Sequence, residues 1–210
     1  MGREVAKLLA KDGYVVGLSA RRLHLLKKIQ EEISTTTYIK QIDVSKPDEA
    51  VKKLEEMTLE IGGLDLIVLS GTGFREVDWT SRDWTADKSV FDVDILGFYA
   101  LARTALNFFE KQGHGHLVGF TSVDGLRGVA DCPAYSAAKA FCSRYMEADR
   151  NRCAQKNLSI TITDIIPGWI NSQEDPEYKK KALKAYWVDS LQDASQEIFL
   201  AIKNKVPVAH

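Results

Sequence analysis

The feature that most constrains this 210-residue chain is a regular alternation of short apolar runs with amphipathic helical stretches. A parallel strand buried on both faces has such an apolar run, and the crossover to the next parallel strand needs a helix. The pattern therefore predicts an α/β fold, a doubly wound three-layer sandwich with a mostly parallel sheet, in one domain spanning residues 1–210. The predicted strands are Tyr14–Ser19, Tyr38–Ile42, Leu64–Leu69, Gly115–Ser122 and Ser159–Ile166, with the opening of another at Val206–His210. The predicted helices are Gly2–Lys11, Arg22–Ile33, Ser45–Glu60, Arg82–Lys111 with a break near Thr85–Asp87, and Pro133–Lys156.

Composition excludes several classes of function. The formal net charge is −1 and no Lys/Arg tract forms a basic face, which argues against a nucleic-acid partner. No apolar run reaches membrane-spanning length and no signal peptide is evident, so we expect a cytoplasmic protein without a membrane partner. Cys132, Cys142 and Cys153 form no CxxC pair and leave an odd count, which favours reduced thiols.

The histidines give no metal-binding pattern. His114 and His116 flank a glycine in what the sequence predicts to be a turn into a strand. We therefore expect a turn exposed to solvent rather than a metal site.

Polar and glycine residues follow the predicted strands. Arg21 follows the first, Asp43 the second, Gly71 the third, Ser122 the fourth and Pro167-Gly168 the fifth. In doubly wound sheets, ligands bind beyond the carboxyl ends of the strands. The sequence therefore predicts one site at that edge.

Tyr135 and Lys139 are the candidate reactive pair at this site. Their spacing of four places phenol and ammonium on one helical face, where the charge favours the phenolate. A phenol tuned in this way can act as a general acid/base, and Ser122 would hold a substrate oxygen beside it. The alternative is that the pair marks an ordinary half-exposed helix face.

These residues resemble the short-chain dehydrogenase/reductase family over essentially the whole chain, which implies a Rossmann-type fold. The matching segments are Ser122 with Tyr135-x-x-x-Lys139, Pro133–Ala140 and Asp164–Ile170. By this resemblance Ser122 orients the substrate carbonyl, Tyr135 exchanges the proton, and Lys139 binds the nicotinamide ribose and lowers the Tyr pKa. It also implies that Pro167, Gly168 and Ile170 meet the nicotinamide, that Asp43 and Val44 contact the adenine, and that Gly71 allows close approach to the adenosine.

The residues after the first predicted strand bear on the choice of cofactor. An acid there would bond a free ribose 2′-hydroxyl, whereas arginine can pair with a 2′-phosphate. Arg21 and Arg22 stand at this place, so the sequence favours NADP(H) over NAD(H). The alternative is that both arginines only begin a solvated helix.

Three departures from the family pattern stand out. The Gly-rich Thr-Gly-x-x-x-Gly-x-Gly turn is absent, with Gly2 at best its last glycine, and the strand before it is missing as well. We expect that the gene product begins farther upstream, because a missing central strand leaves buried backbone edges unpaired. The Asn-Asn-Ala-Gly segment is replaced by Leu69–Thr72, and the helix Asn of the proton relay is replaced by Asp94, whose charge would tend to raise the pKa of Tyr135.

The leading hypothesis is an NADP(H)-dependent oxidoreductase that interconverts a carbonyl and an alcohol of a small-molecule substrate by hydride transfer. The alternative is a non-catalytic scaffold or binding protein that has lost the cofactor cradle. The resemblance places substrate specificity in Asn171–Trp187, whose composition indicates no substrate class. A homodimer or homotetramer is suggested by Phe98, Leu101, Ala105, Phe108 and Phe109, which wrap much of one helix. Burial of that helix between the sheet and its neighbours would explain the same pattern.

Overall fold

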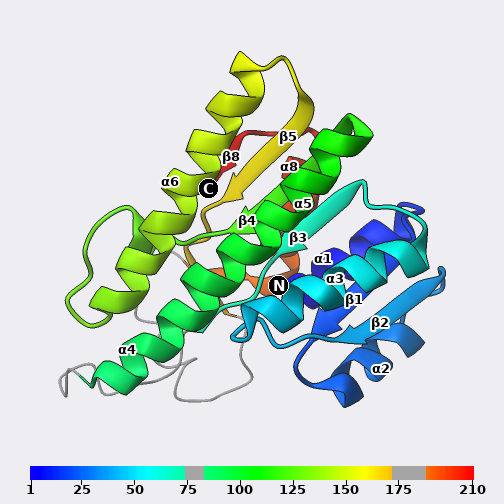
Figure 1. The fold of residues 1–210 in the computed structure, drawn as a ribbon. Helices are drawn as coiled ribbons and strands as arrows, with labels where there is room; N and C mark the ends of the chain where they lie inside the picture. Colours follow the sequence, from blue (N-terminus) through cyan, green and yellow to red (C-terminus); the bar gives the residue numbers. More distant parts are fainter. Residues whose placement is uncertain (74–82, 172–187) are drawn as a thin grey trace.

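The computed structural model describes residues 1–73, 83–171 and 188–210, and the predicted alternation of strands and helices is present (Figure 1). The strands are β1 (Val16–Ala20), β2 (Thr37–Gln41), β3 (Leu66–Leu69), β4 (His114–Phe120), β5 (Ser159–Ile165), β6 (Trp169–Asn171), β7 (Val188–Ser190) and β8 (Val208–Ala209). The helices are α1 (Gly2–Lys11), α2 (Leu23–Glu31), α3 (Pro47–Ile61), α4 (Trp84–Val90), the π-helical turn η2 (Phe91–Gly97), α5 (Phe98–Gln112), the 3₁₀ turn η3 (Val123–Gly125), α6 (Pro133–Gln155) and α8 (Leu191–Lys203).

The strands form parallel sheets in separate pieces. Four of them follow the order β3-β4-β5-β8, β1 pairs with β2 alone, and the short strands β6 and β7 pair with each other. Among the described residues no strand joins β1 to β3. The division falls where the sequence predicts that a central strand is missing.

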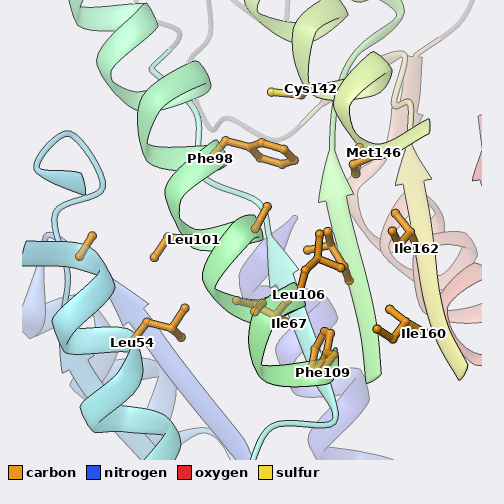
Figure 2. Close-up of a cluster of buried hydrophobic side chains, with 14 of the residues drawn as sticks. Leu54, Ile67, Phe98, Leu101, Leu106, Phe109, Cys142, Met146, Ile160 and Ile162 are labelled. Atoms are coloured by element: carbon orange, nitrogen blue, oxygen red, sulfur yellow. The ribbon is translucent and has the colours of Figure 1, made fainter. Parts of the chain in front are cut away.

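Helices cover both faces of the four-stranded sheet, which makes three layers. On one face α3, α5 and α6 enclose the larger core, in which side chains of α5 meet those of β5 and α6 (Figure 2). On the other face α1 and α8 pack on Val118, Phe120 and Ile165. A smaller cluster joins α2 to β1 through Leu26, Val16 and Leu18.

The apolar residues of α5 belong to the core. Phe98, Leu101, Ala105 and Phe109 are buried, and Phe108 is partly buried against them. Burial between the sheet and the neighbouring helices therefore explains the pattern that suggested oligomerisation.

The break in the long predicted helix lies farther along the chain than predicted. Asp83 caps α4 by accepting a hydrogen bond from the Thr85 backbone N–H at 2.9 Å, and the helix passes through Thr85–Asp87 without a break. The irregular turn is η2, which has π-helical geometry and contains Asp94. The prediction near Thr85–Asp87 was wrong, because a π-turn needs no glycine or proline to mark it in the sequence.

His116 corrects a second prediction. His114 is exposed as expected, but His116 lies in β4 and is buried. Thr163 donates a hydrogen bond to the Val206 carbonyl at 2.7 Å, so its oxygen accepts from His116 Nε2–H at 2.9 Å. Burial lowers the pKa of His116 to about 4, and the neutral ring joins β4 to β5.

Helix α8 and the short strands β6 and β7 were not predicted from the sequence. Ser190 caps α8 by accepting from the Asp193 N–H at 3.0 Å, and Ala194, Ile198 and Ile202 form the buried face of this helix.

No described helix is long and apolar enough to cross a membrane. The three cysteines are buried free thiols.

Candidate active site

Ser122, Tyr135 and Lys139 come together beyond the carboxyl end of β4. Ser122 lies two residues after the end of β4, and Tyr135 and Lys139 lie on the first turns of α6. Tyr135 is hydrogen-bonded to Ser122, and Lys139 Nζ lies 5.5 Å from the centre of the Tyr135 ring. The spacing that the sequence indicated therefore produces a hydroxyl, a phenol and an ammonium in one place.

A buried ion pair holds Lys139 in position. Its Nζ lies 2.9 Å from Asp94 Oδ1 and donates to the Phe120 carbonyl at 3.1 Å, and the Lys139 side chain is 3% exposed. The other carboxylate oxygen of Asp94 accepts from the Gly73 N–H at 2.7 Å. Asp94 thus connects α6 to the segment after β3.

Burial and the neighbouring charges change the pKa of Tyr135 in opposite directions. Burial is the largest influence and raises the pKa of the phenol, while Lys139 and the hydrogen bond with Ser122 lower it. Asp94 and Asp124 raise it again, and the pKa lies above its ordinary value. Burial is also the largest single influence on Lys139 and lowers its pKa, but Asp94 and Tyr135 together outweigh it and the pKa of Lys139 is raised. The ammonium is therefore charged over the whole working pH range, but Asp94 offsets part of its effect on the phenol.

The turn after Ser122 is held against α6. Ser122 Oγ accepts from the Asp124 N–H at 3.2 Å, which caps η3. A Cβ at Gly125 would lie 2.9 Å from the Lys139 carbonyl carbon, so a glycine is needed for this close approach. Ser122 is therefore held in place by its own hydrogen bond within η3. The packing of Gly125 against α6 also holds this turn beside the helix that carries Tyr135 and Lys139.

A second buried network orients the carboxyl ends of β4 and β5. Asp164 accepts from Thr121 Oγ1 at 2.6 Å with one oxygen and from Ser143 Oγ at 2.7 Å with the other. Thr121 immediately precedes Ser122, and Ser143 lies one turn beyond Lys139 on α6. The network therefore fixes the strand ends and the helix relative to each other.

The Pro167-Gly168 turn lies beside this group as predicted. The Pro167 carbonyl accepts from the Val123 N–H at 3.1 Å, so the turn after β5 is tied to the turn after Ser122. A Cβ at Gly168 would meet none of the described residues within 4 Å, so these residues leave open space over the turn. Ile170 is buried in β6. Of the predicted specificity segment Asn171–Trp187, residues 172–187 lie outside the described residues.

The residues predicted to contact the adenosine end of the cofactor are at the carboxyl ends of β1 and β2. Arg21 and Arg22 are exposed, and the Arg21 carbonyl accepts from Gln41 Nε2 at 2.8 Å. Asp43 Oδ1 accepts from Ser45 Oγ at 2.7 Å. Burial acts to raise the pKa of Asp43, but the Ser45 hydrogen bonds outweigh it and the pKa is lowered.

Gly71 and Val44 have different surroundings. Gly71 is exposed, and among residues 1–73, 83–171 and 188–210 a Cβ there would meet nothing within 4 Å. The Val44 carbonyl oxygen would lie only 2.3 Å from a Cβ at Gly97, so η2 packs on the backbone of Val44. Gly71 is thus open to a ligand, while the Val44 backbone serves in part as a packing surface.

Sequence reasoning missed the residues that support Asp94. The Gly73 N–H donates to the Asp94 carboxylate, and Cys142 Sγ–H donates to the Asp94 backbone carbonyl at 2.9 Å. The carbonyl is available because a π-turn interrupts the usual helical pattern. Cys142 lies three residues after Lys139 on α6, which was the only signal available in the sequence.

The described residues fit a nicotinamide cofactor on the side of Ser122 and Tyr135. An ammonium has three donors; Lys139 directs one to the Phe120 carbonyl and is ion-paired with Asp94, so the ammonium retains a donor for a hydroxyl near Tyr135. The open space at Gly71 and Gly168 allows close approach to the backbone. No cluster of potential metal ligands occurs in the described part of the chain.

Comparison with known proteins agrees with this geometry. The short chain dehydrogenase family matches residues 1–182. An uncharacterized oxidoreductase of Myxococcus xanthus is 31% identical over 176 residues, which are 82% of this chain and 69% of the relative. A 3-oxoacyl-[acyl-carrier-protein] reductase of Bos taurus is 26% identical over 95% of this chain and 86% of its own length.

Solved structures share the fold. The closed form of a serine dehydrogenase complexed with NADP+ superposes with a TM-score of 0.82 at 20% identity, over 95% of this chain and 84% of that one. Serine dehydrogenase from Escherichia coli gives a TM-score of 0.81 at 20% identity, over 99% and 89%. The match over residues 1–182 and a relative above 30% identity show that this chain belongs to the short-chain dehydrogenase/reductase family of NAD(P)-dependent oxidoreductases.

Proposed function

We propose that the chain is an NADP(H)-dependent oxidoreductase that interconverts a carbonyl and an alcohol by hydride transfer, with Tyr135 as the general acid/base. The observation that carries the proposal is the contact of the Tyr135 phenol with Ser122 on one side and the Lys139 ammonium on the other. A proton donor, an oxygen anchor and a fixed positive charge are what carbonyl reduction requires of a protein.

Ser122, Tyr135 and Lys139 would have separate roles in the reaction. Ser122 binds the substrate oxygen beside the phenol, and Tyr135 donates its proton to that oxygen as the carbonyl is reduced. The phenolate left behind is stabilised by Lys139, whose charge is secured by Asp94. In alcohol oxidation the same phenolate accepts the hydroxyl proton. When bound, the nicotinamide supplies or accepts the hydride.

Lys139, Pro167 and Gly168 would hold the nicotinamide end of the cofactor. Arg21 and Arg22 would recognise a 2′-phosphate at the other end, with Asp43 and Gly71 beside the adenosine. Two exposed guanidinium groups after β1 support NADP(H) over NAD(H).

The decisive test compares Tyr135→Phe with the unaltered chain. With NADPH and a panel of 3-oxoacyl thioesters, 3-oxo acids and simple ketones, we expect the variant to lose turnover by about 10²- to 10⁴-fold. Its NADPH affinity and melting temperature should stay close to those of the parent, since the phenyl ring fills the same space. Full turnover by the variant would exclude Tyr135 as the proton donor.

A non-catalytic scaffold is the second candidate, and the interruption between β1 and β3 favours it. The interruption lies between β1, which Arg21 and Arg22 follow, and the sheet whose edge carries Tyr135 and Lys139. Titration with NADPH distinguishes the two, because micromolar binding is expected for the enzyme and none for the scaffold.

We also propose that the chain forms a homodimer or homotetramer through α5 and α6. Tyr99 and Phe141 are 43% and 38% exposed and both contact the Tyr145 ring, which gives the two helices a common aromatic surface. Sedimentation equilibrium should show the assembly, and Tyr99→Glu should dissociate it; Leu59→Glu, at an exposed apolar position on α3, is the matched control.

A further inference from the structure

Asp124 brings a carboxylate to the reactive group that the reaction proposed above does not use. Its backbone N–H donates to Ser122 Oγ at 3.2 Å, and Ser122 is hydrogen-bonded to the Tyr135 phenol. Two hydrogen bonds in series span no more than about 6 Å, so the Asp124 backbone lies within that distance of the phenol oxygen. A substrate oxygen held between Ser122 and Tyr135 therefore has Asp124 as a neighbour.

The backbone on both sides of Asp124 is anchored. Asp124 is the middle residue of η3. The Val123 N–H donates to the Pro167 carbonyl at 3.1 Å, and Gly125 packs on the backbone of Lys139, where a Cβ would come within 2.9 Å. The place of Asp124 relative to Tyr135 is therefore fixed by buried and hydrogen-bonded backbone.

The Asp124 carboxylate faces the start of α6. Its charge raises the pKa of the Tyr135 phenol and also that of the Cys132 thiol. Cys132 is the residue directly before α6, and Tyr135 lies in the first turn of this helix. A charge that acts on both groups is near the end of α6 that carries the phenol.

No structural partner accounts for this carboxylate. Within the described ranges its oxygens accept no hydrogen bond and pair with no cation, including Arg127 on the same loop, and the start of α6 receives no side-chain cap. The side chain is half-buried, and burial raises the pKa of its carboxyl group. Asp124 thus gives up part of its hydration, and no described side chain compensates it.

The other charges beside Tyr135 do not compensate Asp124 either. Lys139 Nζ lies 2.9 Å from Asp94 Oδ1 and both side chains are buried, so these two charges offset each other. Asp131, an exposed residue of the same loop, is a further carboxylate. The described groups around the phenol therefore carry an excess of negative charge, which attracts a cationic substrate and repels an anionic one.

We propose that Asp124 is a specificity-determining residue that selects substrates with an ammonium group close to the reacting carbon, namely amino alcohols and the corresponding amino ketones. The proposal rests on the proposed function, because Ser122 and Tyr135 hold the hydroxyl or carbonyl oxygen while Asp124 binds the ammonium. The ammonium donates charge-assisted hydrogen bonds to the carboxylate. In oxidation the hydride of the alcohol carbon passes to NADP+ and the hydroxyl proton to Tyr135, so the ammonium itself is unchanged.

The test compares three small alcohols that differ in one group. Isopropanolamine, propylene glycol and lactate carry an ammonium, a hydroxyl and a carboxylate at the same end of the molecule. With NADP+, kcat/KM of the unaltered chain should be at least about tenfold higher for isopropanolamine than for propylene glycol, and lowest for lactate. Equal values for the three alcohols would overturn the proposal.

Asp124→Asn is the matched variant, because it removes the charge and keeps the size of the side chain and the N–H that Ser122 accepts from. The ratio of kcat/KM between isopropanolamine and propylene glycol should fall to about one. Asp131→Asn, which removes an exposed carboxylate from the same loop, is the control and should keep the parent ratio. An equal fall in both variants would show that general charge, and not Asp124, selects the amine.

A binding measurement separates this proposal from the proposed activity. The three alcohols are titrated into the full chain with NADPH present, so that no alcohol is oxidised, and the amide signals of Asp124 and Gly125 are followed by NMR. Isopropanolamine should bind at least about tenfold more tightly than propylene glycol, and Asp124→Asn should abolish the difference. This result without any turnover would refute hydride transfer and retain the amine site. Turnover of all three alcohols without tighter binding of the amine would do the reverse.

Discussion

The two parts of the parallel sheet hold their functional residues in different ways. Around β4 and β5, buried groups position one another: Lys139 is bonded to Asp94 and Phe120, and Asp164 joins β4 to α6. Around β1 and β2, polar contacts lie on the surface, such as Lys40 to Glu60 at 2.6 Å.

This difference shows which half of the site is ready for chemistry. Buried hydrogen-bonded charges hold one geometry, because any other arrangement leaves a charge unpaired in a poorly solvating interior. Exposed ion pairs contribute little to stability, so they hold β1 and the following Arg21 less firmly. The Ser122, Tyr135 and Lys139 group is therefore preorganised by buried contacts, whereas the arginines after β1 are exposed and less constrained.

The most severe test of preorganisation removes the Lys139 charge. Lys139→Met leaves Asp94 buried without its cation, and we expect the free energy of unfolding to fall by about 3–5 kcal/mol in urea titrations. The control is the double variant Lys139→Met with Asp94→Asn, which should recover at least half of the loss. A single variant as stable as the parent would show that the pair is not a structural anchor.

His116 tests the same sheet through pH. Its folded pKa of about 4 lies below the ordinary value of 6.5, so the unfolded state binds more protons between these values. Stability is full above about pH 6.5 and should fall by roughly 2–3 kcal/mol as the pH drops to about 4. His116→Gln keeps a donor for Thr163 and removes the titration, so its stability should depend less on pH in this window. Equal slopes for both proteins would contradict the assignment.

The arginines after β1 test the less constrained half. Arg21→Ala with Arg22→Ala should weaken NADPH binding by about tenfold and leave NADH binding unchanged, since only NADPH carries the 2′-phosphate. Fluorescence titration with both cofactors measures the difference. Arg144→Ala, which removes an exposed arginine paired with Glu147 on α6, is the control and should change neither affinity. Equal losses for both cofactors would refute 2′-phosphate recognition.

The smallest expected effect concerns Asp94 and the phenol. Asp94 raises the pKa of Tyr135, so Asp94→Asn should lower it and move the acidic limb of the kcat/KM profile for alcohol oxidation to lower pH, because the phenolate that accepts the proton then forms at lower pH. Asp92→Asn removes a charge from the same π-turn, where Asp92 pairs with Lys88, and should leave the profile in place. A shift of equal size in both variants would mean that Asp94 acts through general charge rather than through contact with Lys139.

Much of the fold could be predicted because burial on both faces leaves a direct pattern in a parallel strand. The predicted strand Leu64–Leu69 contains β3, and the helix Pro133–Lys156 matches α6 within one residue. The π-turn at Asp94 and the burial of His116 could not be predicted, since both depend on partners distant in the sequence. For His116 the partner is Thr163, 47 residues away.

The sequence alone determined the alternation of strands and helices, the placement of polar residues after the strands, and the spacing of Ser122, Tyr135 and Lys139. These properties depend on local periodicity, which a single chain displays directly. Only the tertiary structure decided that Asp94 neutralises Lys139, and that His116 joins β4 to β5 through Thr163. Charge pairing and hydrogen bonding between side chains arise between segments far apart in the chain, and local sequence patterns do not encode them.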